Sequence, residues 1–117
     1  MGGAGDGTNP EELFAVGFAA CFEGAMGVVA RRERAELGEY SIASSVSLIP
    51  TDERSFNLAV SLDVTMPGVG DPDQAKRIVA GAHRVCPYSN ATRGNIEVTL
   101  TANGEPVSEL SSAASSR

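Results

Sequence analysis

The sequence predicts a single α+β domain in which two helices pack on a small, mainly antiparallel sheet. Three observations lead to this prediction. An apolar segment with a helix-start motif covers residues 9–30, two alternating apolar and polar segments follow at 40–50 and 55–67, and a second helical pattern at 71–85 precedes a last alternating segment at 94–104. The length of 117 residues fits one domain.

The first helix is predicted to begin at Asn9, which is followed by Pro10 and, three positions after the cap, by Glu12. This is the pattern of an N-cap with a capping box. From residue 13 to residue 30 the helix is apolar almost all round, so we expect a partner subunit to cover part of it. Its glycines indicate either a closely packed backbone or a break near Gly17.

The next two segments, 40–50 and 55–67, are predicted to form a β-hairpin. Apolar residues recur at every second position in both, which is typical of strands with one buried face, and the intervening "PTDER" has turn chemistry. The side chains expected to face the core are Ile42, Ser44, Val46, Leu48, Phe56, Leu58, Val60, Leu62 and Val64.

The second helix is predicted to begin after Asp71, the N-cap, with Pro72 in the first helical position. Pro87 should end it, because proline cannot continue the helical hydrogen-bond pattern. Ala75, Ile78, Val79, Ala82 and Val85 fall at helical spacing. The last strand is then expected at 94–104, with Ile96, Val98 and Leu100 facing inward.

The charge and composition exclude several classes of function. A net charge of −6 argues against a nucleic-acid partner, which requires a basic surface. The longest uninterrupted apolar run, Leu13 to Phe22, has ten residues and is too short for a membrane span. The first residues have neither a basic start nor an apolar run, so we expect no secretory signal and a cytoplasmic protein. Two cysteines and one histidine, without a C-x-x-C motif, fall short of a zinc site.

The two cysteines occupy different local settings. Cys86 lies at the end of the second helix, beside a proline, where the helix C-terminus disfavours a thiolate; a mobile, late-acting thiol fits this position. Cys21 lies within the apolar helix, and Arg31, the nearest cation on that helix, is about 15 Å away along the axis. Spacing alone favours two buried, unreactive thiols.

The segments around the cysteines, "TNPEELFAVGFAACFEGAM" and "AHRVCPYSNATRGNIEVTL", resemble the two signature segments of the organic hydroperoxide resistance (Ohr) family in the OsmC/Ohr superfamily. The resemblance covers residues 3 to about 101. It implies a long apolar central helix packed on a mainly antiparallel sheet, and an intertwined homodimer. It also implies a cytoplasmic thiol peroxidase of the oxidative stress response, which reduces organic hydroperoxides to alcohols without a metal or another cofactor.

The resemblance assigns roles to individual residues. Cys21 matches the peroxidatic cysteine, which becomes a sulfenic acid, and Cys86 matches the resolving cysteine, which forms a disulfide with it. Glu11 matches the carboxylate that orients an activating arginine. The reductant implied is dihydrolipoamide or a lipoylated protein. His83, one turn before Cys86, either assists proton transfer during resolution or is a satisfied boundary residue.

Four apolar side chains near Cys21 allow two interpretations. They either line a site for the alkyl group of the peroxide or are ordinary core residues: Phe14, Phe18, Phe22 and Met26.

The family's activating arginine lies in an N-terminal β segment that has no match in this chain. We therefore expect a single domain at 1–110 that is N-terminally truncated relative to the family, with a disordered tail at 111–117. Arg93 is the candidate substitute cation, although it is also a plausible turn residue. Two alternatives to an Ohr peroxidase stay open: a catalytically impaired remnant that acts as a dimeric scaffold or apolar-ligand binder, and an OsmC-type peroxidase with a different peroxide preference.

Overall fold

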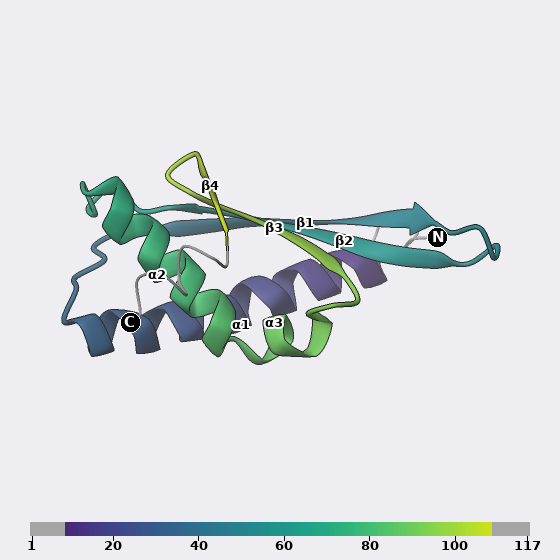
Figure 1. Ribbon diagram of the computed structural model, residues 1–117, viewed down its shortest axis with the longest axis horizontal. Helices are drawn as coiled ribbons and strands as arrows, with labels where there is room; N and C mark the ends of the chain where they lie inside the picture. The colour runs from purple at the N-terminus through teal and green to yellow at the C-terminus, as the bar shows by residue number, and fades with distance from the viewer. Residues whose placement is uncertain (1–8, 109–117) are drawn as a thin grey trace.

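The computed structural model describes residues 9–108, which form a four-stranded sheet with three helices (Figure 1). The predicted tail at 111–117 and the ends of the predicted 1–110 domain lie outside these residues. The strand order is β1-β2-β3-β4. In chain order the elements are α1 (Pro10–Glu33), β1 (Ser41–Pro50), β2 (Phe56–Thr65), α2 (Pro72–Val85), α3 (Pro87–Thr92), β3 (Glu97–Ala102) and β4 (Glu105–Val107).

Helix α1 begins as the sequence predicts. The Asn9 side chain accepts a hydrogen bond from the Glu12 N–H at 2.8 Å, and the Glu12 carboxylate accepts one from the Asn9 N–H at 3.3 Å. The helix runs through Gly17 without a break. The ring of Tyr88 lies against this glycine, since a Cβ added there would be 3.3 Å from the Tyr88 hydroxyl oxygen. The close approach of the Tyr88 ring, rather than a helix break, therefore explains why position 17 is a glycine.

Strands β1 and β2 form the predicted hairpin. They pair antiparallel from Ser41–Thr65 to Pro50–Phe56, and the predicted inward residues of both strands lie on the helix-covered face. Phe56 is the exception, with 60% of its side-chain surface exposed. The reason is its place at the tip of the hairpin, which projects beyond the helices (Figure 1).

The sheet is mixed, because β2 and β3 pair in parallel through the α2–α3 connection, while the two outer pairings are antiparallel. Strand β4 was not predicted. Asn103 and Gly104, both with positive φ, turn the chain back on itself, and Asn-Gly is a strong hairpin signal. The Asn103 side chain also accepts a hydrogen bond from the Met66 N–H at 2.7 Å, which ties this turn to the end of β2.

Helices α1 and α2 lie on the same face of the sheet, and the core fills the space between them (Figure 1). The other face is lined by small or polar side chains that are exposed, such as Ser45, Asp63 and Thr99. The largest fully buried apolar side chains are Phe18, Phe22, Met26, Leu62, Met66, Ile78, Val64 and Val79. The hydrophobic core therefore lies on one face of the sheet, between the sheet and the helices.

The sequence predicted no membrane span, because the apolar run from Leu13 to Phe22 is short. Helix α1 is longer than this run. Its 24 residues are long and apolar enough, by length and composition only, to cross a membrane. Seven of its residues are buried within the domain, as in the core helix of a soluble protein. The helix is therefore no positive sign of a membrane protein.

Candidate functional site

The two cysteines, 65 positions apart in sequence, lie side by side in the fold. Their Sγ atoms are 3.4 Å apart, and both are free thiols. Cys21 projects from the middle of α1 and is partly exposed, whereas Cys86 is fully buried at the junction of α2 and α3. A disulfide needs the sulfurs to approach to about 2.05 Å, so a small movement would join them.

Pro87 places Cys86 at this junction, because α2 ends before the proline and α3 begins with it. The Cys86 N–H donates to the Ala82 carbonyl at 2.8 Å, and its own carbonyl accepts from the Asn90 N–H at 3.0 Å. The sequence predicted a mobile residue at a helix C-terminus. Instead, the backbone of Cys86 is hydrogen-bonded on both sides, and the residue is also the N-cap of the unpredicted helix α3.

The thiol of Cys86 has a raised pKa. Burial is the main cause, and the nearby Cys21 sulfur adds to it. The backbone N–H and the hydroxyl of Ser89 act in the opposite direction, because both are hydrogen-bond donors that favour the thiolate. The net effect keeps Cys86 protonated at neutral pH.

A second polar group adjoins this thiol. The Nδ1 atom of His83, on α2, is 2.8 Å from the Ser89 hydroxyl oxygen, on α3, and both side chains are buried. The sequence assigned Ser89 no chemistry. A proline directly after a capping position is a signal for a new helix, and it could have shown that Ser89 faces Cys86.

An aromatic cluster lies beside the cysteines. Tyr88 stacks on Phe14, with ring centroids 6.0 Å apart, and meets Phe18 edge-on at 5.6 Å. Tyr88 is 39% exposed, and the sequence assigned it no chemistry. Of the four predicted lining residues, Phe14 is partly exposed, whereas the other three, Phe18, Phe22 and Met26, are fully buried in the core.

Glu11 is not brought against the sulfurs. It lines a hollow of about 480 Å³ at the first turn of α1, with Ala15 and with Ser44 of β1. Ten helical residues, or about 15 Å, separate it from Cys21 along the axis. Arg93 donates from its guanidinium to the His83 carbonyl at 2.9 Å and to the Asn90 side chain. The roles of Glu11 and Arg93 stay predictions.

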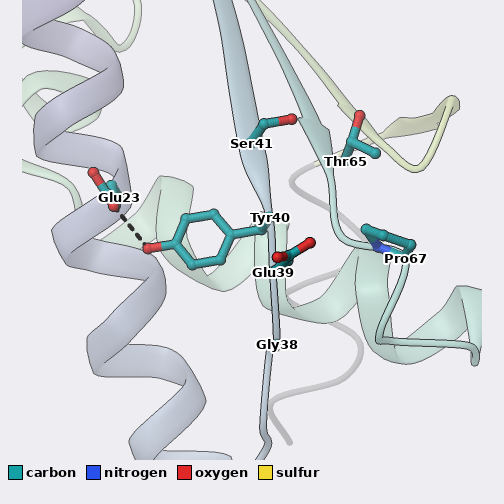
Figure 2. A pocket seen from close by; sticks show the side chains of 7 residues that line it. All are labelled: Glu23, Gly38, Glu39, Tyr40, Ser41, Thr65 and Pro67. Carbon is teal, nitrogen blue, oxygen red and sulfur yellow. Dashed lines mark hydrogen bonds between the residues drawn. The ribbon is translucent and has the colours of Figure 1, made fainter.

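Another hollow lies on a different side of α1 (Figure 2). Its volume is about 620 Å³, and its lining includes Glu23, Tyr40 and Thr65. The Tyr40 hydroxyl donates to the Glu23 carboxylate at 2.8 Å, and this hydrogen bond raises the pKa of Tyr40. Glu23 and Cys21 are two positions apart, so they point to nearly opposite sides of the helix. This hollow is therefore separate from the thiol pair.

Residues 9–108 contain no cluster of three histidine, cysteine, aspartate or glutamate side chains that could hold a metal ion. Ser89 is the polar residue that acts on the Cys86 thiol, and its hydroxyl in turn contacts the imidazole of His83.

Comparisons with known proteins show the family of the chain. The family of OsmC-like proteins matches residues 3–101. An organic hydroperoxide resistance protein of Xanthomonas axonopodis pv. citri is 55% identical over 105 residues, which are 86% of this chain and 71% of the relative. The organic hydroperoxide resistance protein OhrA of Bacillus subtilis is 47% identical over 94 residues, covering 80% of this chain and 65% of OhrA.

Solved structures show the same fold. The organic hydroperoxide resistance protein OsmC of Legionella pneumophila superposes with a TM-score of 0.78 at 49% identity, over 85% of this chain and 72% of the other. OhrB of Bacillus subtilis superposes with a TM-score of 0.76 at 44% identity, over 80% of this chain and 69% of OhrB.

Proposed function

The chain belongs to the OsmC-like family, as one of its organic hydroperoxide resistance proteins, and on this premise we propose that it is a thiol peroxidase that reduces organic hydroperoxides to alcohols. The observation that carries the proposal is the 3.4 Å distance between the Cys21 and Cys86 sulfurs. A partly exposed thiol in contact with a buried one is the arrangement that two-step thiol chemistry requires.

In the first step the Cys21 thiolate attacks the terminal oxygen of the hydroperoxide. The O–O bond breaks, the alkoxide takes a proton and leaves as the alcohol, and the sulfur is oxidised to a sulfenic acid. The partial exposure of Cys21 lets the peroxide reach it, and the rings of Phe14 and Tyr88 offer apolar contact to the alkyl group.

In the second step the Cys86 sulfur attacks the sulfenic sulfur of Cys21. A disulfide forms, and the sulfenic oxygen leaves as water. Full burial of Cys86 keeps it from reacting with peroxide itself, while its position next to Cys21 makes the attack intramolecular. We assign re-reduction to a dithiol, dihydrolipoamide or a lipoylated protein, by thiol–disulfide exchange in the cytoplasm.

We also propose that the chain acts as a homodimer. Leu13 and Val16 on α1 are 62% and 66% exposed, and the exposed residues Ala20 and Gly24 continue the same stripe along the helix. The stripe adjoins a hollow of about 290 Å³ lined by Val16, Ala19 and Ala20. An apolar stripe of this kind in a chain with 15 acidic residues is suited to a second copy of itself.

The test is peroxide consumption by the Cys21→Ser and Cys86→Ser variants. With tert-butyl hydroperoxide and dihydrolipoamide, Cys21→Ser should lose all turnover, because the attacking sulfur is gone. Without the dithiol, Cys86→Ser should consume one equivalent of peroxide and then stop, leaving a sulfenic acid on Cys21 that dimedone traps. Wild-type rates in Cys21→Ser would refute the mechanism. No consumption by the wild type would favour a non-catalytic scaffold.

A further inference from the structure

His83 is a buried titratable group that the two chemical steps above do not use. It is the only histidine of the chain, and its side chain is 4% exposed. Its Nδ1 atom is 2.8 Å from the hydroxyl oxygen of Ser89, which is fully buried. An imidazole in such a place is able to accept a proton through the hydroxyl that it contacts.

The hydroxyl of Ser89 in turn faces Cys86. Cys86 is the N-cap of α3 and Ser89 the third residue of that helix, two positions whose side chain and backbone N–H approach each other at a helix start. The Ser89 hydroxyl and N–H both lower the pKa of the Cys86 thiol, which places them near its sulfur, although Cys86 makes no side-chain capping hydrogen bond. The imidazole contacts the hydroxyl, the hydroxyl lies near the Cys86 sulfur, and that sulfur contacts the Cys21 sulfur.

Cys86 needs such a chain of contacts. Its burial raises the pKa of the thiol, whereas only the thiolate is an effective nucleophile. With no exposed surface, the thiol cannot hand its proton to bulk water. A buried base must receive the proton when Cys86 attacks.

We propose that Ser89 is a catalytic residue and His83 a positioning residue that together accept the Cys86 proton during disulfide formation. The proposal rests on the proposed function of Cys86. The Cys86 proton passes to the Ser89 oxygen as the Ser89 proton passes to His83 Nδ1. The freed sulfur electron pair forms the S–S bond, and the S–O bond of the sulfenic acid breaks. The leaving hydroxide takes up a proton to become water, and the imidazolium returns its proton to solvent.

The same contacts fit both ends of this transfer. Before it, the Cys86 thiol, which donates to the Cys21 sulfur in the structure, turns its proton to the Ser89 oxygen, and the Ser89 hydroxyl donates to the imidazole. After it, the imidazolium donates to the Ser89 oxygen and the Ser89 hydroxyl donates to the thiolate, which is the contact that favours the charged sulfur. One shift of two protons reverses the direction of every hydrogen bond without moving a heavy atom.

Charged groups lie around His83 on several elements. Arg93, next to α3, places its guanidinium on the His83 carbonyl, and Arg84 is the following residue of α2. The other charged residues of α2, β3 and β4 are Asp73, Lys76, Arg77, Glu97 and Glu105, of which Lys76 pairs with Glu105 and Arg77 with Glu33 of α1.

The attack of Cys86 can be measured without peroxide. One equivalent of dithiobis(nitrobenzoate) converts the more exposed Cys21 into a mixed disulfide and releases one coloured thiolate. Cys86 then attacks the Cys21 sulfur and releases a second. The first phase reports Cys21 alone, and the second reports the nucleophilic attack of Cys86. The variant Cys86→Ser should show the first phase only.

Two variants test the transfer of the Cys86 proton through Ser89 to His83, which we call the relay. His83→Asn keeps an oxygen near the position of Nδ1 but cannot accept a proton, and Ser89→Ala removes the connecting hydroxyl. Both should leave the first phase unchanged and slow the second by about tenfold or more at neutral pH, because general base catalysis is lost. Ala91→Ser, an exposed change on α3, is the matched control and should keep both phases.

The pH profile separates a proton acceptor from a structural residue. In the wild type the second phase should stop rising with pH once His83 is neutral. In His83→Asn it should keep rising with hydroxide concentration up to the pKa of Cys86. A second phase with the wild-type rate and profile in either variant overturns the proposal, and if His83→Asn does not fold, Ser89→Ala decides.

Failure of the relay and failure of the proposed function give different results. A protein that does not react with peroxide, yet shows a second phase that depends on His83 and Ser89, has the relay without the peroxidase activity. A peroxidase whose second phase ignores both residues lacks the relay.

Discussion

Cys86 shows how one residue depends on two helices. Pro87 ends α2 and starts α3, and the cysteine between them is buried by both. Burial raises the pKa of its thiol, and Ser89 counters part of this effect. The residue is thereby protected from peroxide and needs help to ionise, which suits a thiol that acts only after Cys21 has been oxidised.

The raised pKa of Cys86 makes the stability of the reduced protein depend on alkaline pH. Below the ordinary thiol pKa of 9.0 the group is protonated in both folded and unfolded chains, so its contribution is complete. Above that value the unfolded chain loses the proton first, and the free energy of unfolding falls until the folded thiol also ionises. Urea denaturation between neutral pH and about pH 10 should show this fall, and Cys86→Ser should show less of it. An identical fall in the variant would place the effect in other groups, such as Tyr40.

Helix α1 has one buried face and one exposed apolar face. One buries Phe18, Phe22 and Met26 against the sheet and α2, and it brings Cys21 to Cys86. The other exposes Leu13 and Val16 together with small residues. The apolar character of the helix all round follows from this division, because one face fills the core and the second is left for a partner.

A charge on the exposed face should separate the subunits. Val16→Lys places an ammonium in the centre of the apolar stripe, where a second copy would have to desolvate it. We expect analytical ultracentrifugation to show a dimer for the wild type and at least a tenfold weaker dissociation constant for the variant. Thr99→Lys, an exposed change on the open face of the sheet, is the matched control and should stay dimeric. A wild-type association constant in Val16→Lys would exclude this face as the interface.

The cysteine pair joins distant parts of the fold. Cys21 lies on the first helix and Cys86 at the end of the second, with the β1–β2 hairpin between them in sequence. A disulfide here would close a loop of about 65 residues through the core. Oxidation during each catalytic cycle should therefore change the stability of the entire domain and not only of the site.

We expect the oxidised protein to unfold with a free energy about 2–4 kcal/mol higher than the reduced protein, because the cross-link restricts the unfolded chain. Urea denaturation of one preparation, with and without prior treatment by one equivalent of hydroperoxide, measures the difference. The Cys86→Ser variant, which cannot form the bond, should show no such gain. Equal stability of the two wild-type forms would mean that no disulfide has formed between Cys21 and Cys86.

The sequence by itself determined the elements with local signals. Asn9 with Glu12, and Asp71 with Pro72, fix helix starts through contacts within a few residues, and the alternation along 42–48 and 58–64 fixes which face of the hairpin is covered. The Asn103–Gly104 turn was equally local, and its hairpin was overlooked. The resemblance of two segments indicated the family, which the comparisons confirm, and named the cysteines as a pair.

Only the tertiary structure decided which distant groups meet. The 3.4 Å contact of Cys21 with Cys86, the Tyr88 ring over Gly17 and the hydrogen bond of His83 to Ser89 all join different helices. Their geometry is set by how the helices pack on one face of the sheet, and no periodicity along the chain carries that information. Burial is likewise a property of the packed whole, and it makes Cys86 a thiol that needs a base while leaving Val16 open to a partner.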